Sequence, residues 1–372
     1  MQTLRPRSAE ELAATMRELA ASSQSVRLSG ARTKDRMAGP IASAPCEVST
    51  SLLNQVIGYD PRDLTISVGA GMRWSELTAL LAENGQMIPL DPAFSASATV
   101  GGVVASNSSG PRRHLYGSAR DVVIGMTFAT LEGKLIQSGG NVVKNVAGLD
   151  MAKLMIGSFG TLAAIASVNF KLAPAPQHTR TFLFSCSSLQ EAIAARDRVL
   201  GGVLQPAALD LLNASAAARV GLPERPTLLV GASGTHAVLG RYAKELADAT
   251  DTLQGDEESR LWLKVREFTP AMLAASADAV VVRTACTLTA LPGVLAQASG
   301  PAVARAGAGV VYSYTEGNAS RLTGTVEFSP EAMKDKLDLW PQPGSGFAVM
   351  EKIKKLFDPG RLLNRGRLYG RI

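Results

Sequence analysis

The chain is poor in the residues that build disulfide and structural metal sites. Its 372 residues include three cysteines and three histidines. Cys46, Cys186 and Cys286 form no Cys-x-x-Cys pair and are too sparse for a disulfide scaffold, which favours a reducing compartment. Three scattered histidines also leave little room for a His-rich catalytic metal centre. The sequence therefore predicts no metal site.

Several signals of targeting and of common enzyme classes are missing too. Residues 1–7 have no apolar core of a secretory signal, and the longest uncharged stretch, residues 154–170, is shorter than the roughly 20 residues of a membrane span. Neither G-x-G-x-x-G nor G-x-x-x-x-G-K-[ST] occurs, nor do G-x-S-x-G, H-E-x-x-H or an EF-hand loop. Aromatic residues are 5% of the chain and do not alternate with basic ones, so nucleic-acid binding is not expected. The sequence predicts a cytoplasmic protein.

The composition is that of a globular protein with an uneven charge. Apolar residues make up 46% and charged residues 19%, and the length favours two or three domains. The net charge is +6, and residues 351–372 carry most of it. The rest of the chain is close to neutral. A local anion site, an acidic partner or a solvated surface are the explanations left open.

Periodicity and turn residues predict strands mixed with helices. Ser8 with Glu11 is a capping box for a helix, and Pro174 and Pro176 mark a domain boundary. Helices are expected near residues 8–20, 75–81, 188–200, 235–249, 291–298 and 347–357, and strands near 26–29, 64–68, 122–130, 135–136, 181–186, 227–230, 280–286, 310–314 and 323–328. This mixture predicts an α+β fold, a sheet covered by helices.

Three segments of small residues could hold a phosphorylated ligand through backbone N–H groups. They are residues 29–34, 98–110 and 157–162, and glycine is concentrated around the last two. Glycine removes conformational order, so a cluster of glycines favours tight turns or a backbone that lies against a ligand. Taken singly, each segment is equally well explained by the packing of small residues.

Together, these segments resemble a known family. The sequence is similar to the p-cresol methylhydroxylase-type FAD-binding domain of the vanillyl-alcohol oxidase superfamily, and within it to the FAD-binding subunits of bacterial glycolate oxidase (glycolate dehydrogenase). The resemblance is carried by residues 64–71, 85–92, 99–102, 109–113, 116–121, 143–148, 157–162 and 357–364. It implies a two-subdomain FAD-binding domain over residues 1–175, an α+β cap over 176–335, and a C-terminal segment, 336–372, that returns to the FAD domain.

The resemblance also implies a set of cofactor contacts. Residues 30–34 would hold the FAD pyrophosphate, and Asn364 would reach the flavin region from the C-terminus. Many relatives attach FAD through a histidine in the first loop; here Thr33 and Lys34 take that place, so non-covalent FAD is expected. The implied cofactor-binding residues are Gly30, Ala31, Arg32, Thr33, Lys34, Pro92, Thr99, Gly101, Gly102, Ser106, Ser109, Gly110, Ser118, Asp121, Gly160, Thr161, Ile165 and Asn364.

Oxidation of a 2-hydroxy acid needs a hydride acceptor, a base and a cation for the carboxylate. Flavin would supply the first of these. Arg113, His114 and Lys144 are the candidate catalytic residues, with Arg112 as a further cation, and surface charge is the competing explanation for the cations. In the related catalytic subunit the resemblance leads us to expect an H-x-G-D-G-N-x-H metal motif. Residues 304–312 match its glycines but have lost its histidines and its acid.

Three functions remain open. The chain is an FAD-binding subunit of a glycolate oxidase complex, with a second flavoprotein subunit and an iron–sulfur subunit as partners; or a self-sufficient FAD oxidoreductase acting on a hydroxy acid or another alcohol; or a non-catalytic scaffold. In the first case the complex is cytoplasmic, or peripheral at the inner membrane through its partners.

Overall fold

The computed structural model describes residues 1–140, 150–317 and 323–372. Lys144 and the motif at 143–148 lie outside these residues. The chain forms two compact units, each of which is described by itself. The first unit comprises Met1–Ser109, Ser118–Ala175 and Gln342–Ile372, and the second comprises Gly110–Gly117 and Pro176–Pro341. Residues 110–117, which the sequence predicts to lie in the FAD domain, thus fall in the second unit.

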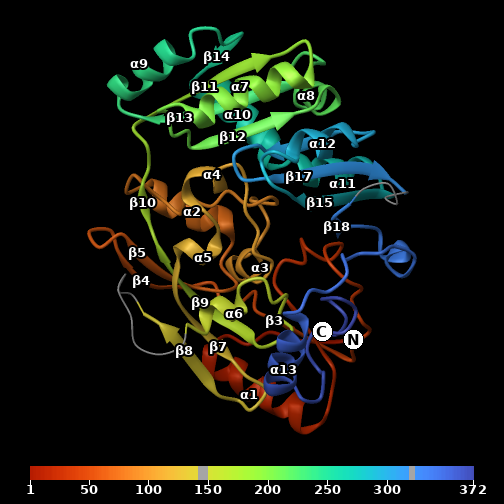
Figure 1. The fold of residues 1–372 in the computed structure, drawn as a ribbon. Coiled ribbons are helices and arrows are strands. Elements are labelled where there is room, and N and C mark those ends of the chain that lie inside the picture. The colour runs from red at the N-terminus through yellow and green to blue at the C-terminus, as the bar shows by residue number, and fades with distance from the viewer. Residues whose placement is uncertain (141–149, 318–322) are drawn as a thin grey trace. The chain divides into compact units, whose positions relative to one another are not determined.

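The first unit contains two main sheets (Figure 1). A three-stranded parallel sheet has the order β1-β3-β2, and a five-stranded antiparallel sheet has the order β4-β5-β9-β7-β8. The strands of this unit are β1 (Gln2–Leu4), β2 (Val26–Ser29), β3 (Cys46–Ser49), β4 (Val56–Asp60), β5 (Thr65–Gly69), β6 (Gln86–Met87), β7 (Val123–Ala129), β8 (Leu135–Gly139), β9 (Ala164–Lys171) and β10 (Ala173–Pro174). Its helices are α1 (Ala9–Ala21), α2 (Trp74–Ala82), α3 (Val100–Ala105), α5 (Ala119–Val122), α6 (Ala152–Met155) and α13 (Phe347–Phe357).

The core of the first unit follows from the apolar faces of its elements. Ser8 caps α1 by accepting a hydrogen bond from Glu11 N, and Leu12, Met16 and Leu19 of that helix are buried. β9 is buried along seven of its eight residues because strands pair with it on both sides. It accounts for seven of the 17 residues in the long uncharged stretch at 154–170.

The second unit is built on one antiparallel sheet of eight strands, in the order β14-β11-β13-β12-β16-β17-β15-β18. The strands are β11 (His178–Ser185), β12 (Ala208–Leu212), β13 (Thr227–Gly234), β14 (Asp251–Leu253), β15 (Ala279–Ala285), β16 (Ala302–Arg305), β17 (Val310–Glu316) and β18 (Thr325–Phe328). The helices are α4 (Arg113–Tyr116), α7 (Leu189–Gly201), α8 (Ala214–Val220), α9 (His236–Glu245), α10 (Gly255–Arg266), α11 (Phe268–Ala275), α12 (Leu291–Ala296) and a 3₁₀ turn, η1 (Glu331–Lys336).

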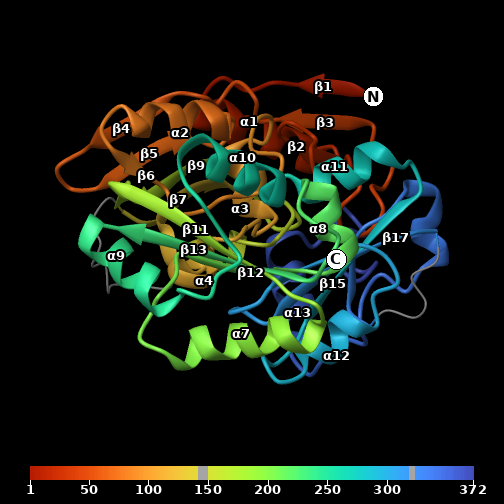
Figure 2. The same cartoon turned by 90° about the horizontal axis from the view of Figure 1, so that it is seen from above.

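The two faces of this sheet differ in chemistry. Helices α7, α9 and α12 pack on an apolar face, which includes Leu211, Val230 and Val311 (Figure 2). The opposite face is more polar: Glu258 of α10 contacts Thr181, and Thr269 of α11 bonds the hydroxyl of Tyr314 at 2.7 Å. The prediction of an α+β fold with helices over a sheet is confirmed.

The described residues contain neither a membrane-spanning helix nor a cluster of metal-ligating side chains. No helix among them is long and apolar enough to cross a membrane. Within the same residues, no three His, Cys, Asp or Glu side chains come together in a way that could hold a metal ion.

Glu258 makes the stability of the second unit depend on pH. Burial raises its pKa above the ordinary 4.5, although hydrogen bonds from Thr179 and Thr181 and the charge of Arg180 oppose this shift. The folded state therefore binds more protons than the unfolded state between 4.5 and the raised pKa. The free energy of unfolding must fall as pH rises through that window.

We expect Glu258→Gln to remove this fall, because an amide does not ionise and the Thr179 hydroxyl can rotate to accept from it. Urea unfolding of both proteins between pH 4 and pH 8 checks the expectation. The free energy of unfolding of the variant should rise relative to the parent as pH increases. If the free energy of unfolding changed with pH in the same way in both proteins, Glu258 would have the same pKa in the folded and unfolded states.

Candidate functional site

A cavity in the first unit collects residues that are distant in the sequence. Its wall is formed by the loop after β2, the start of α3, the turn before β9 and the chain end near Asn364. The loop consists of residues 30–35, and Arg32 in it has a φ of 57°, in the left-handed region. Such a turn directs successive N–H groups toward one point.

The amides of this loop are available to a ligand. Within the described chain, no acceptor takes the backbone N–H of Gly30, Ala31, Arg32 or Thr33. Consecutive unpaired amides on a cavity wall are the geometry that binds phosphate oxygens. The loop also lies close to α3, since a Cβ on Gly30 would lie 2.2 Å from Thr99 Oγ1. Glycine is therefore required at position 30 for this packing.

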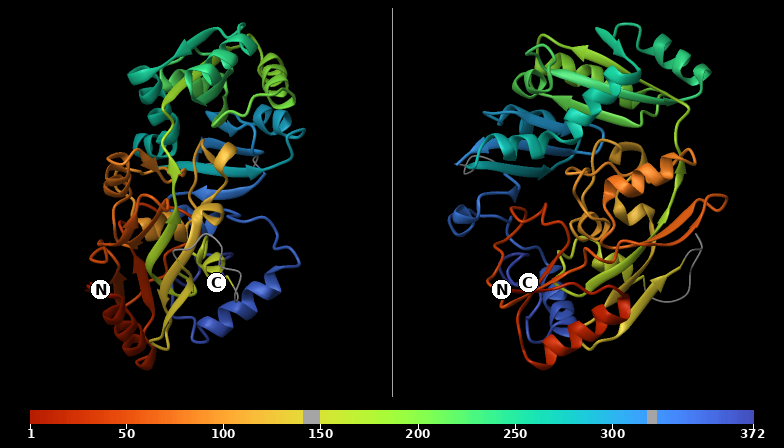
Figure 3. Two further views of the ribbon diagram at one scale, coloured as in Figure 1. Left: turned by 90° about the vertical axis from the view of Figure 1, so that its left-hand side faces the viewer. Right: turned by 180° about the vertical axis from the view of Figure 1, so that it is seen from behind.

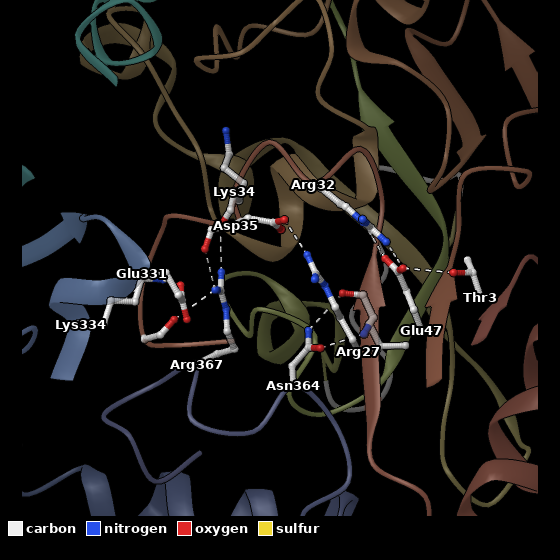
Figure 4. A network of polar contacts seen from close by, with 12 residues as sticks. Thr3, Arg27, Arg32, Lys34, Asp35, Glu47, Glu331, Lys334, Asn364 and Arg367 are labelled. Atoms are coloured by element: carbon white, nitrogen blue, oxygen red, sulfur yellow. Dashed lines mark hydrogen bonds and ion pairs between the residues drawn. The ribbon is translucent and has the colours of Figure 1, made fainter. Parts of the chain in front are cut away.

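The side chain of Arg32 forms an ion pair with a buried acid, Glu47. Its guanidinium bonds both carboxylate oxygens of Glu47 on β3, with Nε 2.8 Å from Oε1 (Figure 4). Burial raises the pKa of Glu47, but the hydrogen bonds and charge of Arg32 outweigh it, and the pKa lies below its usual value. The Arg32 side chain thus fixes the loop to β3.

The C-terminal segment holds two walls of the cavity together. Asn364 Oδ1 accepts from Leu28 N at 2.8 Å, and its Nδ2 donates to Phe159 O at 2.6 Å (Figure 4). Arg367 donates to three carbonyls of the first loop region, Lys34 O at 2.9 Å, Gly39 O at 3.1 Å and Asp35 O at 3.2 Å. One short segment therefore bonds both the loop after β2 and the turn before β9.

A buried ion pair anchors this segment. Lys354 Nζ on α13 lies 2.7 Å from Asp358 Oδ2 and also donates to Thr161 O at 2.7 Å. The Asp358 carboxylate accepts from the amides of Leu362 and Leu363, both at 2.8 Å. Every charged atom of the pair thus has a partner, and the chain direction between α13 and Asn364 is fixed.

Twelve of the predicted cofactor residues lie on the cavity wall: Gly30, Ala31, Arg32, Thr33, Lys34, Thr99, Gly101, Gly102, Ser106, Gly160, Ile165 and Asn364. The wall does not include Pro92, Ser109, Gly110, Ser118, Asp121 or Thr161. Ser118 and Asp121 instead form a capping box at the start of α5. Their assignment to the cofactor stays a prediction.

Sequence reasoning missed several residues of this site. Arg367 follows Asn364 by three positions, and the accumulation of positive charge near the C-terminus was the signal that could have found it. Glu47 gave no signal, because an acid in a short apolar strand shows its partner only in three dimensions. Phe159 lines the cavity and lies under the Arg367 guanidinium, 5.6 Å from it.

The second unit carries a group of charged residues on the polar face of its sheet. Arg283 pairs across the ladder with Tyr312, and Arg305 lies 5.6 Å from the Tyr312 ring while forming a buried ion pair with Asp210. Burial raises the pKa of Tyr312, Glu327 adds to this, and Arg283, Arg305 and Arg113 oppose it. An uncharged phenol among arginines can donate a hydrogen bond to an anion.

Two of the three candidate catalytic residues lie in the same unit. Arg113 and His114 are the first residues of α4 and lie in the second unit, and His114 packs against Gly307. Burial lowers the pKa of His114, with a smaller opposing contribution from the Gly307 backbone. The imidazole is thus neutral near pH 7 and can accept a proton. Lys144 lies outside the described residues.

The chemistry of the cavity fits FAD. The four unpaired amides suit its diphosphate, and the apolar wall of Ala163, Ala164 and Ile165 suits a ring.

Comparisons with known proteins agree with this geometry. Residues 2–139 match the family model described as FAD binding domain. Residues 175–343 and 340–368 match the model described as FAD linked oxidases, C-terminal domain. The second match spans more than half of the chain.

Two curated relatives cover different parts of the sequence. The chain is 35% identical over 168 residues to glycolate oxidase subunit GlcE of Escherichia coli (strain K12), covering 45% of this chain and 47% of that protein. It is 30% identical over 285 residues to a D-lactate dehydrogenase of Anaerostipes hadrus, covering 74% of this chain and 56% of that protein. The chain spans about half of the length of these relatives.

A solved structure shares the fold. An alkyldihydroxyacetonephosphate synthase superposes with a TM-score of 0.73 at 17% identity, covering 97% of this chain and 75% of that one. At this identity the likeness concerns architecture alone.

The Lys354–Asp358 pair gives a stability prediction. Asp358→Ala leaves the Lys354 ammonium buried without its counter-ion and removes the acceptor of two amides. We expect the free energy of unfolding to fall by about 3 kcal/mol in urea titrations. Lys352→Ala, on the exposed side of the same helix, is the control and should change it by less than about 0.5 kcal/mol. Equal losses in the two variants would contradict a structural role for the pair.

Proposed function

This chain belongs to the family of FAD-linked oxidases, and on that basis we propose that it is the FAD-binding subunit of an oxidoreductase complex that oxidises glycolate to glyoxylate. The observation that carries the proposal is the row of unpaired amides from Gly30 to Thr33 on the cavity wall. The similarity to a glycolate oxidase subunit supports the choice of substrate.

In this proposal the residues of the cavity hold and orient the cofactor. The amides of residues 30–33 bind the diphosphate, and Gly101 and Gly102 keep the start of α3 close to it. Asn364 fixes the distance between Leu28 and Phe159, so that the two walls stay in register. Bound FAD, held non-covalently, would supply the hydride acceptor.

The substrate side rests on different residues. A 2-hydroxy acid needs a cation for its carboxylate, and Arg113, Arg283 and the Tyr312 hydroxyl of the second unit offer suitable donors. His114, neutral near pH 7, is the proposed base for the hydroxyl proton. D-lactate is a second candidate substrate, because a D-lactate dehydrogenase is among the relatives.

Electrons must then leave through a partner. Cysteine-ligated iron–sulfur clusters of the common types use four thiolates, whereas this chain has three cysteines in all, of which Cys46 and Cys186 are buried. We therefore propose a second flavoprotein subunit and an iron–sulfur subunit as partners, in a cytoplasmic complex that reaches the inner membrane only through them. The similarity to a protein named as a subunit supports this arrangement.

Substitution of Gly30 tests whether FAD binds at this loop. Gly30→Ala forces a Cβ against Thr99 Oγ1 and displaces the loop, so FAD affinity should fall by about tenfold. The matched control is Gly58→Ala, where an added Cβ meets nothing within 4 Å, and its FAD affinity should equal that of the parent. Titration of FAD into flavin-free protein, followed by fluorescence, measures both. Equal affinities in all three proteins would place FAD away from this loop.

Turnover distinguishes the subunit from a complete enzyme and from a scaffold. Purified chain should be yellow and release FAD on denaturation, and glycolate alone should not bleach it. Bleaching should appear once the co-purified partners are added, with D-lactate as the competing substrate. Bleaching by the chain alone would favour a self-sufficient oxidoreductase, and absence of flavin would favour a scaffold.

A further inference from the structure

The C-terminal segment presents positive charge, and of its exposed cations only Arg365 lines the cavity. Of its seven cationic residues, Lys354 and Arg367 are buried and bonded within the first unit. The other five, Lys352, Lys355, Arg361, Arg365 and Arg371, are exposed. The segment's two acids do not balance them, because Asp358 is buried against Lys354 and Glu351 is half-buried.

These five cations have no counter-ion. Among the described residues, no carboxylate lies within 4.0 Å of any of them. Elsewhere on the surface, comparable side chains are paired, as in Arg198–Asp248 at 2.6 Å and Lys134–Glu132 at 2.5 Å. Lys352 and Lys355, three residues apart on α13, repel each other, so an anion bound beside them would be favoured.

Exposed apolar side chains lie among the cations. Leu356 is 78% exposed and is the most exposed large apolar side chain of the described part of the chain, and Val349, two turns earlier on α13, is 56% exposed. On the same helix, which Figure 3 shows in two views, Phe347 is buried, and Ile353 and Phe357 are partly buried and pack against the core of the first unit. The exposed pair is therefore not needed for packing of α13.

A groove begins beside Leu356. It lies within the first unit, between the end of α13 and the end of α1, and its lining includes Ala20, Leu131, Leu356, Phe357, Pro359 and Leu362. Glu132 on its rim is already paired with Lys134, so it does not neutralise the cations. Arg365 also lines the groove. Arg361 stands between the lining residues Gly360 and Leu362, so two exposed cations, Arg361 and Arg365, border a hollow with several apolar side chains. This is the pattern of a protein interface with an apolar centre and a charged rim.

We propose that this C-terminal patch (Val349, Lys352, Lys355, Leu356, Arg361 and Arg365, with the groove beside Leu356) docks an acidic segment of a partner protein, one apolar side chain of which enters the groove. The occupant is acidic, because none of the four cations of the patch has a counter-ion among the described residues. A second copy of this chain would bring the same cations together and is disfavoured. A bilayer surface is disfavoured too, because the patch has no Trp or Tyr anchor and its apolar centre is concave.

Site-specific crosslinking tests the proposal without reference to turnover. A photoreactive phenylalanine analogue replaces Leu356 in the full chain, expressed in its source organism, and the crosslinked peptide is sequenced by mass spectrometry. The same analogue at Val203, which is 64% exposed on the second unit, is the position control. We expect one defined adduct at position 356 with a peptide of net negative charge, and none of that mass at position 203.

Reversing the charge of the patch provides a second test of the docking proposal. The triple variant Lys352→Glu, Lys355→Glu, Arg361→Glu, none of whose positions lines the FAD cavity, should lower the adduct yield about tenfold, as should raising the salt to 0.5 M. Its control reverses three exposed arginines of the second unit, Arg219, Arg225 and Arg260, with the same change in net charge and an unchanged yield. Thermal unfolding of both triple variants should match the parent.

Five outcomes would overturn the proposal. They are no adduct at position 356, an adduct with a neutral or basic peptide, an adduct with phospholipid, an adduct with a second copy of this chain, and a yield that the control variant lowers as much. None of them bears on FAD binding or glycolate oxidation, so the docking proposal and the proposed function can fail separately.

Discussion

The cavity depends on hydrogen bonds between two ends of the sequence. Asn364 bonds the backbone of Leu28, 336 residues earlier, and Arg367 bonds three carbonyls between Lys34 and Gly39. These bonds use the side chains of Asn364 and Arg367 and involve none of the amides of residues 30–33, which stay unpaired among the described residues. The site therefore exists only when the chain end is in place. The buried Lys354–Asp358 pair matters for the same reason, because it fixes the path into that end.

The two units contribute different chemistry to the proposed reaction. The first unit offers backbone amides and an apolar wall, which suit a large nucleotide cofactor. The second offers arginines, a protonated tyrosine and a neutral histidine, which suit a small carboxylate. Neither set alone would explain an oxidoreductase. Lys352, Lys355 and Arg361 of the C-terminal segment belong to neither set.

Part of this picture could be predicted from the sequence. Local signals placed the helix capped by Ser8 and the strand before Gly30, and a series of small-residue motifs placed most of one cavity wall. The start of α2 was less well defined: the helix begins at Trp74 without a side-chain cap, although Ser75 follows. The strand β3 was not predicted, because it has four residues and so short an alternation of apolar and polar residues is a weak signal.

The rest lay beyond any local pattern. The ion pair of Arg32 with Glu47 and the bonds of Arg367 join residues that only the fold brings together. The division into units is similar: residues 110–117 follow the first wall in sequence, yet their helix α4 contacts β12 of the second unit. The positive charge of the C-terminus was visible in the sequence, but its separation into buried and exposed cations required the packing of α13.

The central claim is that the amides of residues 30–33 bind the diphosphate of FAD. Amide NMR spectra of the flavin-free protein, recorded with FAD and with riboflavin, test it most directly. The account predicts large downfield shifts of the Gly30, Ala31, Arg32 and Thr33 amide protons with FAD and none with riboflavin, which has no phosphate. FAD binding that leaves these four resonances unchanged would contradict it.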